Sequence, residues 1–340
     1  MKKMKWLAVI LAVMLAVVSG CGQKQTGNNG KSSDKDGVKT IKIAHYFAAD
    51  HPQNIALKEK FKPMVEEKTN GKIKVEIYEA NKLGDEASFT NGVRNGTIEM
   101  AIAGMGLQTA QPKIGVVEWP YLFKDYEHAR KVLNGEVGEE IKEEFRKLGV
   151  EPIGWTVNGF RVVSANRPIK SMDDFKGFRL RMPNVPIFVE TGKAMGANVT
   201  PMALSEVFTA LEQKVIDGQE NPYLTLKANG WYEVQSHVIE TNHMFSPNVY
   251  LINKKLFDGF DKETQEIILE AAKASADYQW ELALKAENEV KDFLKKEGLE
   301  IIVPDREFRS QLEKSVEPVY EKLYKQYDWA EELVKKIREQ

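Results

Sequence analysis

The sequence has a single cysteine, five histidines and almost no net charge, and each shortage excludes a class of function. Cys21 alone cannot form a disulfide within the chain or a multi-cysteine metal site. The histidines show no HExxH or other tight metal-binding spacing. Lys and Arg number 48 against 50 Asp and Glu, so a net charge of −2 gives no sign of a nucleic-acid surface. No apolar run is long enough to span a bilayer.

The sequence also lacks the common catalytic and nucleotide-binding motifs. It contains no G-x-S-x-G nucleophile turn, no P-loop and no G-x-G-x-x-G following a strand. Acidic residues are plentiful, but at this density they usually form a solvated face. We therefore expect no enzymatic activity, no cofactor and no bound metal.

The first 37 residues differ from the rest of the chain. Three lysines precede an apolar run over residues 6–18, which predicts a secretory signal peptide over residues 1–20. The sequence VSGC that follows resembles a bacterial lipobox, in which Cys21 is acylated; the alternative is plain cleavage beside an incidental cysteine. Residues 21–37 are polar and predict a lipidated, flexible tether. These features predict an extracytoplasmic protein, anchored by lipid to the outer face of the cell membrane or periplasmic.

The body of the chain opens with a strand–helix–strand pattern. Residues 40–45 (TIKIAH) alternate like a strand, residues 52–70 read as a helix, and residues 72–78 (KIKVEIY) form a second alternating run. This spacing is typical of a βαβ unit, which requires a parallel sheet covered by helices. The sequence therefore predicts an α/β fold.

A weak internal similarity indicates two related lobes. Residues 93–99 (VRNGTIE) align with residues 211–217 (LEQKVID), and each stretch reads as a helix end that turns into an Ile-acid pair. Only the apolar and acidic positions match, so chance similarity is an alternative. Two α/β lobes with equivalent loops facing each other are the simplest arrangement that explains the match.

A long uninterrupted helix is predicted near the C-terminus. Asp261 can cap a helix that continues without Gly or Pro until Gly298. A length of about 54 Å, at roughly 1.5 Å per residue, could brace both lobes. A break near residues 273–276 would instead give two ordinary helices. Residues 301–303 predict a final strand, and Asp305 and Asp328 are expected to start two further helices.

Two arginines lie close together in the alternating segment GFRLRMPN, residues 177–184. Alternation at period two predicts a strand with Arg179 and Arg181 on one face. Arg181 stands at the strand's end, and ligands of open α/β sheets bind at the carboxyl ends of strands. Its guanidinium can hold a carboxylate through two parallel hydrogen bonds. The alternative is that both arginines are surface charges of small energetic weight.

Two more polar segments are candidates for binding. Residues 158–164 (NGFRVVS) predict another strand, which contains Arg161. Ser205 can cap a helix that ends at residues 217–218 and whose Val207, Leu211 and Val215 share one face. The segment QENPY follows, in which the proline favours an extended Asn221 whose amide can both donate and accept. The alternative is a simple polar turn.

Taken together, four segments resemble one known family. SMDDFKGFRLRMPN, ANVTPMALSEVFTALEQKVIDGQENP, NGFRVVSANRPI and KLGDEASFTNGVRNGTIEMAIAG are similar to the solute-binding receptors of TRAP transporters, of the dicarboxylate-receptor (DctP-like) type. The resemblance extends from TIKIAH to the C-terminal helices. It implies two α/β lobes of the periplasmic-binding-protein fold, joined by a hinge and braced by a long C-terminal helix. We assign residues 38–157 plus 247–286 to lobe I and residues 158–246 plus 287–340 to lobe II.

The resemblance also implies roles for individual residues. Arg181 corresponds to the arginine that forms a two-pronged salt bridge with the ligand carboxylate, and Asn221 to the asparagine that steadies it. Arg161 resembles a second arginine near the ligand. Further candidates for the ligand site are His45, Trp155, Tyr223 and Asp85, although the aromatic ones could equally belong to the core.

The resemblance has departures that bear on the ligand. Gly104 and Leu204 occupy positions where sialic-acid receptors carry an acidic residue and a phenylalanine, so sialic acid is not expected. Arg161 as a second cation favours a C4-dicarboxylate, whereas aromatic and hydroxyl-binding groups favour a sugar acid. We expect a receptor that passes an organic acid to the membrane permease of a TRAP transporter. The alternatives are a receptor that presents the acid to a histidine kinase, and a receptor of an ABC importer.

Overall fold

The computed structural model describes residues 38–340, which form one compact unit of two β-sheets and their covering helices. The predicted signal peptide, the tether and Cys21 lie outside the described residues. Within the described part, no helix is both long and apolar enough to cross a bilayer.

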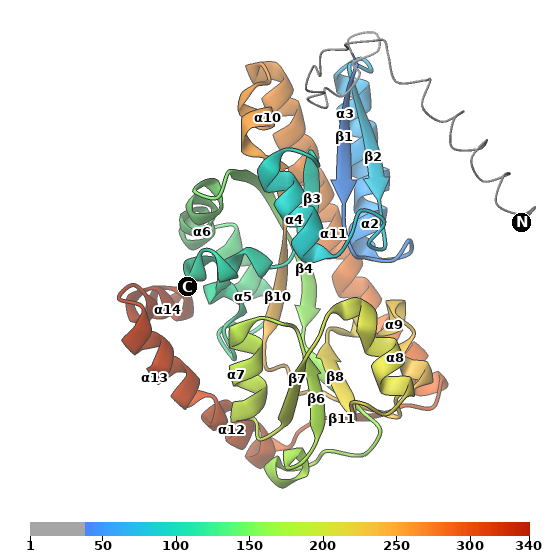
Figure 1. Ribbon diagram of the computed structural model, residues 1–340, viewed down its shortest axis with the longest axis vertical. Helices are drawn as coiled ribbons and strands as arrows, with labels where there is room; N and C mark the ends of the chain where they lie inside the picture. The colour runs from blue at the N-terminus through green and yellow to red at the C-terminus, as the bar shows by residue number, and fades with distance from the viewer. Residues whose placement is uncertain (1–37) are drawn as a thin grey trace, which may run out of the picture. The chain divides into compact units, whose positions relative to one another are not determined.

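The first sheet has the strand order β2-β1-β3-β10-β4 and forms the core of the first lobe (Figure 1). Its first two strands are parallel, with Ile41 opposite Val75, which confirms the predicted βαβ unit. Strand β3 is also parallel to β1, and β10 lies antiparallel between β3 and β4. The strands are β1 (Lys39–Ala44), β2 (Ile73–Tyr78), β3 (Met100–Ala103), β4 (Val150–Phe160) and β10 (Phe245–Asn253).

The second sheet has the order β11-β9-β5-β8-β6-β7 and belongs to the second lobe. Strands β6, β7 and β8 run parallel to one another, and β5 lies antiparallel between β8 and β9. The predicted final strand is confirmed as β11. The strands are β5 (Val162–Ala165), β6 (Arg179–Met182), β7 (Asn198–Pro201), β8 (Gly218–Asn221), β9 (His237–Ile239) and β11 (Glu300–Ile302).

The chain crosses between the two sheets at Arg161. The prediction of a single strand over residues 158–164 is wrong. Strands β4 and β5 belong to different sheets, and Arg161 lies between them. Gly159 turns the chain at φ +127°, a conformation that side chains with a Cβ rarely adopt. The register between β4 and β10 shifts beside Pro247, which has no N–H for the ladder. Arg161 is therefore a junction residue between the lobes.

Helices cover both sheets. The predicted helix over residues 52–70 is interrupted by a π-helical turn, η1, that precedes Pro63, which cannot donate a backbone hydrogen bond. The helices and turns before the long helix are α2 (Pro52–Ala56), η1 (Leu57–Phe61), α3 (Lys62–Lys68), α4 (Glu86–Asn95), η2 (Gly106–Thr109), η3 (Pro112–Glu118), α5 (Tyr126–Leu133), α6 (Glu136–Arg146), η4 (Met172–Phe175), α7 (Pro186–Ala194), η5 (Leu204–Glu206), α8 (Val207–Glu212), α9 (Tyr223–Ala228), η6 (Trp231–Glu233) and α10 (Lys254–Asp258).

The long helix α11 (Lys262–Lys296) is continuous over 35 residues, and the alternative break at residues 273–276 does not occur. Asp261 caps it by accepting the Thr264 N–H at 2.8 Å, as predicted. The helix packs on α2, α3 and β4 of the first lobe and on α9 and β11 of the second (Figure 1). The prediction of one brace for both lobes is confirmed.

The internal similarity between residues 93–99 and 211–217 recurs in the structure. Each segment leaves a helix through a left-handed residue, Gly96 at φ +77° or Lys214 at φ +58°, and enters a strand that pairs in parallel with its neighbour. The acid of each segment accepts a backbone N–H from that neighbouring strand, so the two lobes repeat one local design. These bonds are Lys42 N–H to Glu99 at 3.0 Å and Arg179 N–H to Asp217 at 2.9 Å.

The helix expected after Ser205 is shorter than predicted. A 3-10 turn precedes α8, and α8 ends at Glu212, so Val215 is 51% exposed instead of sharing the buried face of Val207 and Leu211. The left-handed Lys214 ends the helical pattern. The alternative of a polar turn at QEN is also wrong, because residues 218–221 form the buried strand β8.

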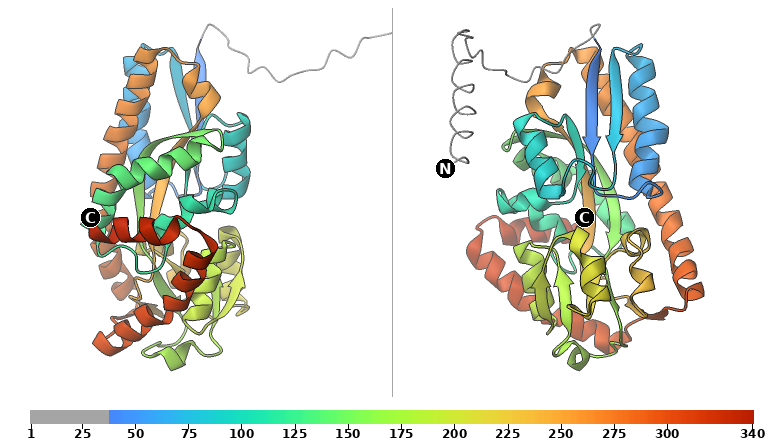
Figure 2. Two further views of the ribbon diagram at one scale, coloured as in Figure 1. Left: turned by 90° about the vertical axis from the view of Figure 1, so that its left-hand side faces the viewer. Right: turned by 45° about the vertical axis from the view of Figure 1, so that its right-hand side comes forward.

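The last three helices run past both lobes (Figure 2). They are α12 (Arg306–Ser315), α13 (Glu317–Gln326) and α14 (Ala330–Glu339). Asp305 caps α12 as predicted, whereas α14 begins after Trp329. Helices α12 and α13 contact η4 and α7 of the second lobe, but α14 contacts α6 and η3 of the first. The division of the chain into lobes at numbered residues stays a prediction.

Candidate ligand-binding site at the lobe junction

Polar side chains gather where the carboxyl ends of β6 and β8 meet the crossing strand. Arg181 lies opposite Gln219 in the parallel pair β6–β8, and Asn221 ends β8 opposite Val162 of β5. Because Arg161 directly precedes Val162, the fold brings these three predicted residues to one end of the second sheet. All three side chains are buried, with exposed fractions of 2–4%.

Arg161 is held by an acid that the sequence analysis did not identify. Its Nε and Nη2 donate to the two carboxylate oxygens of Glu220, and Nη2 also donates to the Glu220 carbonyl oxygen at 2.9 Å. Nη1 donates to Ser246 Oγ at 2.9 Å. His243 Nε2 lies 3.1 Å from the same Glu220 carboxylate. The only sequence signal for this pairing is an acid next to Asn221, which gives no indication of its partner.

The Arg161–Glu220 pair is ionised despite complete burial. Burial by itself raises the pKa of Glu220, but the charge of Arg161 and the hydrogen bonds from His243 and Arg161 outweigh it and bring the pKa below its ordinary value. Burial likewise lowers the pKa of Arg161, and Glu220 more than restores it. The positive charge of Arg161 is thus compensated within the protein.

Arg181 has no such compensation. Its Nε and Nη2 donate to one backbone oxygen, Met202 O, at 3.1 and 2.7 Å. Its Nη1 is buried and has no hydrogen-bond partner, and among residues 38–340 no carboxylate lies within 4 Å of the guanidinium. Burial lowers the pKa of Arg181 to about 10. A buried guanidinium without a paired carboxylate is costly in free energy, so Arg181 stays a candidate for binding an anion.

Asn221 belongs to a chain of amide and hydroxyl groups on the same strand. Its Nδ2 donates to Gln219 Oε1 at 2.8 Å, and Gln219 Nε2 donates to Ser164 Oγ at 2.9 Å. Ser164 in turn donates to Gln235 Oε1 at 3.0 Å. These bonds fix the orientation of the Asn221 amide, so its Oδ1 and second N–H have defined directions.

The first lobe contributes a second group of buried polar atoms around Gly104, just after β3. A Cβ at Gly104 would lie 3.3 Å from Glu86 Oε1, 3.7 Å from Tyr46 Oη and 3.8 Å from Asn248 Nδ2, so these side chains converge there. Asn248 Nδ2 donates to Tyr46 Oη at 2.9 Å, and Gln53 Nε2 donates to Asn248 Oδ1 at 3.3 Å. Gln53 Oε1 is buried without a partner in the described part, and Glu86 Oε1 is buried next to the backbone of Gly104 and Gly106 with no hydrogen bond of good geometry. Free acceptors of this kind suit hydroxyl groups.

Two acids, Glu86 of this group and the buried Glu118, have raised pKa values. Burial raises the pKa of Glu86 to about 7, against the opposing effect of the backbone N–H groups of Gly104 and Gly106. Burial raises the pKa of Glu118 to about 8, which the charge of Arg161 opposes. Glu118 accepts Gln108 Nε2 at 2.9 Å. Both acids were missed, because an acid in a helix or turn looks like an ordinary surface residue in the sequence.

Glu118→Gln is expected to remove a pH dependence of stability. A carboxyl group whose pKa is higher in the folded protein than in the unfolded chain stabilises the folded state most at low pH. For Glu118 this contribution is complete below the unfolded pKa, about 4.5, and it is lost as the pH rises through the folded pKa, about 8. Between pH 5 and pH 8 the variant should therefore gain about 3 kcal/mol in unfolding free energy relative to the wild type. Urea unfolding at both pH values measures this gain, with the exposed Glu321→Gln as control. An equal difference at both pH values would contradict the assignment.

The remaining predicted residues lie in other surroundings. Asp85 caps α4 by accepting the Ser88 N–H at 2.8 Å, and its neighbour Glu86 reaches the polar group instead. His45 lies 3.2 Å from Asn54 Oδ1, and burial lowers its pKa to about 4, so it is neutral; its Nδ1 is buried without a partner in the described part. Tyr223 donates to Glu240 at 2.9 Å.

Trp155 lies in the core of the first lobe. Its ring packs edge-on against Phe145 at 6.1 Å, and its carbonyl accepts the Trp280 indole N–H at 3.2 Å. It also lines a pocket of about 630 Å³ next to α5 and α11, separate from Arg181. Whether any predicted site residue contacts a ligand stays a prediction. Among residues 38–340, no group of three or more His, Cys, Asp or Glu side chains is placed to hold a metal ion.

Comparisons with known proteins agree with this architecture. The profile of the family described as bacterial extracellular solute-binding protein, family 7 (DctP), matches residues 43–327. An uncharacterized protein of Haemophilus influenzae is 46% identical over 323 residues, which cover 95% of this chain and 98% of the relative. The 2,3-diketo-L-gulonate-binding periplasmic protein YiaO of Escherichia coli is 33% identical over 267 residues, or 78% and 81% of the two chains.

A solved structure gives the same result in three dimensions. The crystal structure of a TRAP periplasmic solute-binding protein from Haemophilus influenzae with bound L-gulonate is 48% identical, with a TM-score of 0.87 over 88% of this chain and 99% of that one. The family match, the two lobes and the long bracing helix all agree with the resemblance seen in the sequence. The chain belongs to family 7 of the bacterial extracellular solute-binding proteins, the solute receptors of TRAP transporters.

Proposed function

We propose that the chain is a receptor for a sugar acid, an aldonate or uronate, whose carboxylate binds Arg181 at the lobe junction. The observation that carries the proposal is the buried guanidinium of Arg181, whose Nη1 has no partner in the described part of the chain. An incoming carboxylate supplies both the missing hydrogen bonds and the missing negative charge. The named ligands of two similar proteins, L-gulonate and 2,3-diketo-L-gulonate, are acids of this type.

The charges at the junction favour a monocarboxylate over a dicarboxylate. Arg161 is the second cation that would suit a dicarboxylate, but Glu220 already occupies its guanidinium. Arg161 then acts by positioning β5 and β8 at the crossing, with Asn221 as the second group on the ligand. At the carboxyl ends of β6 and β8, Arg181 is the one cation of the described residues without a paired carboxylate, and it matches a ligand with one negative charge.

The first-lobe polar group supports hydroxyl recognition. Glu86, Gln53 and Asn248 offer acceptors and donors close to one another, and a linear or cyclic sugar acid has a hydroxyl on nearly every carbon. A ligand held by Arg181 on one lobe and by these groups on the other favours the closed state, because it bonds both lobes only when they approach.

We further propose that the receptor delivers its ligand unchanged to the membrane subunits of a TRAP transporter, without catalysis. Its place of action is outside the cytoplasmic membrane, as the names of its periplasmic relatives indicate. We also propose that Cys21 is acylated, and this proposal rests on the VSGC sequence alone. Mass spectrometry of the mature N-terminus in membrane fractions tests it, and an unmodified cysteine in the soluble fraction would contradict it.

Thermal shift against a ligand panel tests the proposed ligand class. L-Gulonate or a uronate at about 100 times its dissociation constant should add about 2.7 kcal/mol of stability, which raises Tm by several degrees. Succinate and malate, which lack the hydroxyl array and carry a second charge, should have little effect. Stabilisation by the dicarboxylates alone would overturn the sugar-acid proposal and leave the receptor class intact.

A further inference from the structure

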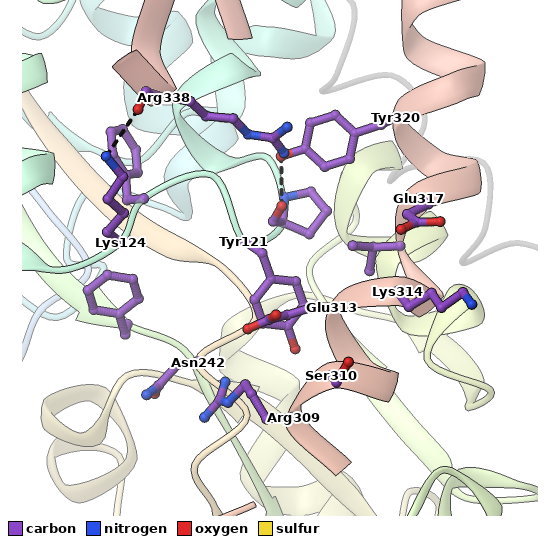
Figure 3. Close-up of a pocket in the computed structure, with 14 residues that line it drawn as sticks. Tyr121, Lys124, Asn242, Arg309, Ser310, Glu313, Lys314, Glu317, Tyr320 and Arg338 are labelled. Carbon is purple, nitrogen blue, oxygen red and sulfur yellow. Dashed lines mark hydrogen bonds between the residues drawn. The ribbon is translucent and has the colours of Figure 1, made fainter. Parts of the chain in front are cut away.

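A pocket of about 950 Å³ lies beside the crossing strands and contains none of the residues of the Arg181 site (Figure 3). One wall is the loop over residues 120–124 of the first lobe, and another is formed by α12, α13 and the end of α14. Phe160 at the end of β4 and Asn242 between β9 and β10 complete it. Its size suits a small organic molecule.

The lining of this pocket is positively charged. Four cations and two carboxylates border it, for a local charge of about +2. The cations are Lys124, Arg309, Lys314 and Arg338, and the carboxylates are Glu313 and Glu317.

None of these four cations has a carboxylate oxygen within 4 Å among residues 38–340. Some other cations of the same C-terminal helices are paired. Lys322 lies 2.8 Å from Glu190, and Lys336 lies 2.8 Å from Glu136. Among the described residues, the pocket therefore places four unpaired cations next to paired cations of the same helices.

Three of the cations are held in place by neutral groups. Arg309 donates through Nη2 to Glu240 O at 2.6 Å and through Nη1 to the carbonyl oxygen of Thr241. Arg338 lies over the Tyr320 ring at 4.8 Å, and Lys124 Nζ donates to the Arg338 carbonyl at 3.1 Å (Figure 3). These contacts fix the side chains without neutralising them. A fixed positive charge loses less conformational entropy when it binds an anion.

The backbone next to the pocket is strained. Tyr121 and Asn242, which both line it, have φ values of +52° and +43°, unusual for residues other than glycine. The Tyr121 N–H donates to His243 O at 2.9 Å, and this bond joins the two strained segments. Strained residues of this kind cluster at ligand sites. Since His243 also contacts Glu220, the pocket adjoins the buried network of the first site.

We propose that this pocket is a second binding site, for an organic polycarboxylate. Arg309 and Arg338 offer planar donor groups, and Lys124 and Lys314 add charge from two sides of the opening. A polycarboxylate can engage both lobes at once, because Lys124 belongs to the first lobe and Arg309 lies on α12, which packs on the second. The site shares no residue with the proposed sugar-acid site.

Citrate is the probe for this second site. Isothermal titration uses the receptor carrying Arg181→Ala, so that the first site cannot hold the probe through its arginine. Saturable binding of one citrate per chain is expected at low ionic strength, and binding should weaken as salt is added. Lys314→Glu combined with Arg338→Glu should weaken it about tenfold or more. The matched control is Lys325→Glu, an exposed lysine of α13 that does not line the pocket, with an expected change below about twofold.

The outcomes separate clearly. Loss of citrate binding in the double variant and its retention in the Lys325 variant support the site. No saturable heat at millimolar citrate, or equal affinity in the double variant and the parent, overturns it. Circular dichroism of each variant before titration ensures that only folded protein is compared.

Discussion

Arg181→Ala is expected to weaken binding of the sugar acid by about 100-fold to 1000-fold while leaving the unliganded protein as stable as the wild type. Each charge-assisted hydrogen bond contributes about 1.5–3 kcal/mol, and a two-pronged carboxylate pair contains two of them. A loss of about 3–4 kcal/mol corresponds to the expected range of affinity. Stability should change little, because Arg181 is a buried cation that lacks an anionic partner in the described part of the chain.

The matched control is Arg179→Ala, on the same strand. Arg179 is paired with Asp217 on the exposed side of β6, with its side chain 44% accessible. Its removal should change affinity by less than about twofold, since its charge is exposed to solvent and already paired with Asp217. Arg181→Lys is a second comparison, because a lysine keeps the charge but cannot form the planar fork.

Isothermal titration with the acid found in the thermal-shift panel measures all three variants. An unchanged dissociation constant in Arg181→Ala would remove Arg181 from the site. A large loss of stability in that variant, together with the loss of binding, would instead show a structural role. Near-normal affinity in Arg181→Lys would argue against two parallel hydrogen bonds.

Glu220→Ala is expected to be the most destabilising single change at the lobe junction. It leaves Arg161 buried and without its counter-charge, which typically costs about 3–5 kcal/mol. Glu220 lies in the middle of β8 with no exposed surface, so water cannot replace it. The unfolding free energy of the variant, measured by urea denaturation, should fall by this amount.

Asp217→Ala is the natural comparison for Glu220→Ala. Both acids lie at or next to β8 and both hold an arginine through two nitrogens, but the Asp217–Arg179 pair is accessible to water. Its loss removes an exposed ion pair and one backbone hydrogen bond, and it should cost about 1–2 kcal/mol, less than Glu220→Ala. Equal effects of the two substitutions would show that Glu220 and Arg161 are not a buried charge pair. Restoration of stability by the double variant Glu220→Ala with Arg161→Met would support the pairing directly.

The sequence predicted the features that depend on residues close together along the chain. The strands at residues 40–45 and 72–78, the cap at Asp261 and the long helix follow from alternation, helical periodicity and capping chemistry. The position of Arg181 at the end of β6 also follows, because a proline directly after an alternating run marks the strand's carboxyl end. The paired lobes were visible for the same reason, since each helix end repeats one local turn.

Other features depend on which segments lie side by side. The break between β4 and β5 at Arg161 arises where two sheets meet, and the pattern NGFRVVS continues through it without interruption. Val215 has the spacing of a buried residue, yet the left-handed Lys214 exposes it. The sequence pattern indicates Asp85 and not Glu86, because only the fold distinguishes a helix cap from a side chain that faces the polar group around Gly104.

By itself, the sequence determined the fold class, the receptor family and a guanidinium at the end of a strand. The tertiary structure decided which arginine is free. Arg161 and Arg181 look alike in the sequence, but β8 places Glu220 against Arg161 and leaves Arg181 with a backbone oxygen as its only partner in the described chain. The sequence could not show this difference, because periodicity predicts only whether a side chain is buried. Whether a buried arginine has a carboxylate beside it depends on strand β8, which lies about 40 to 60 residues further along the chain.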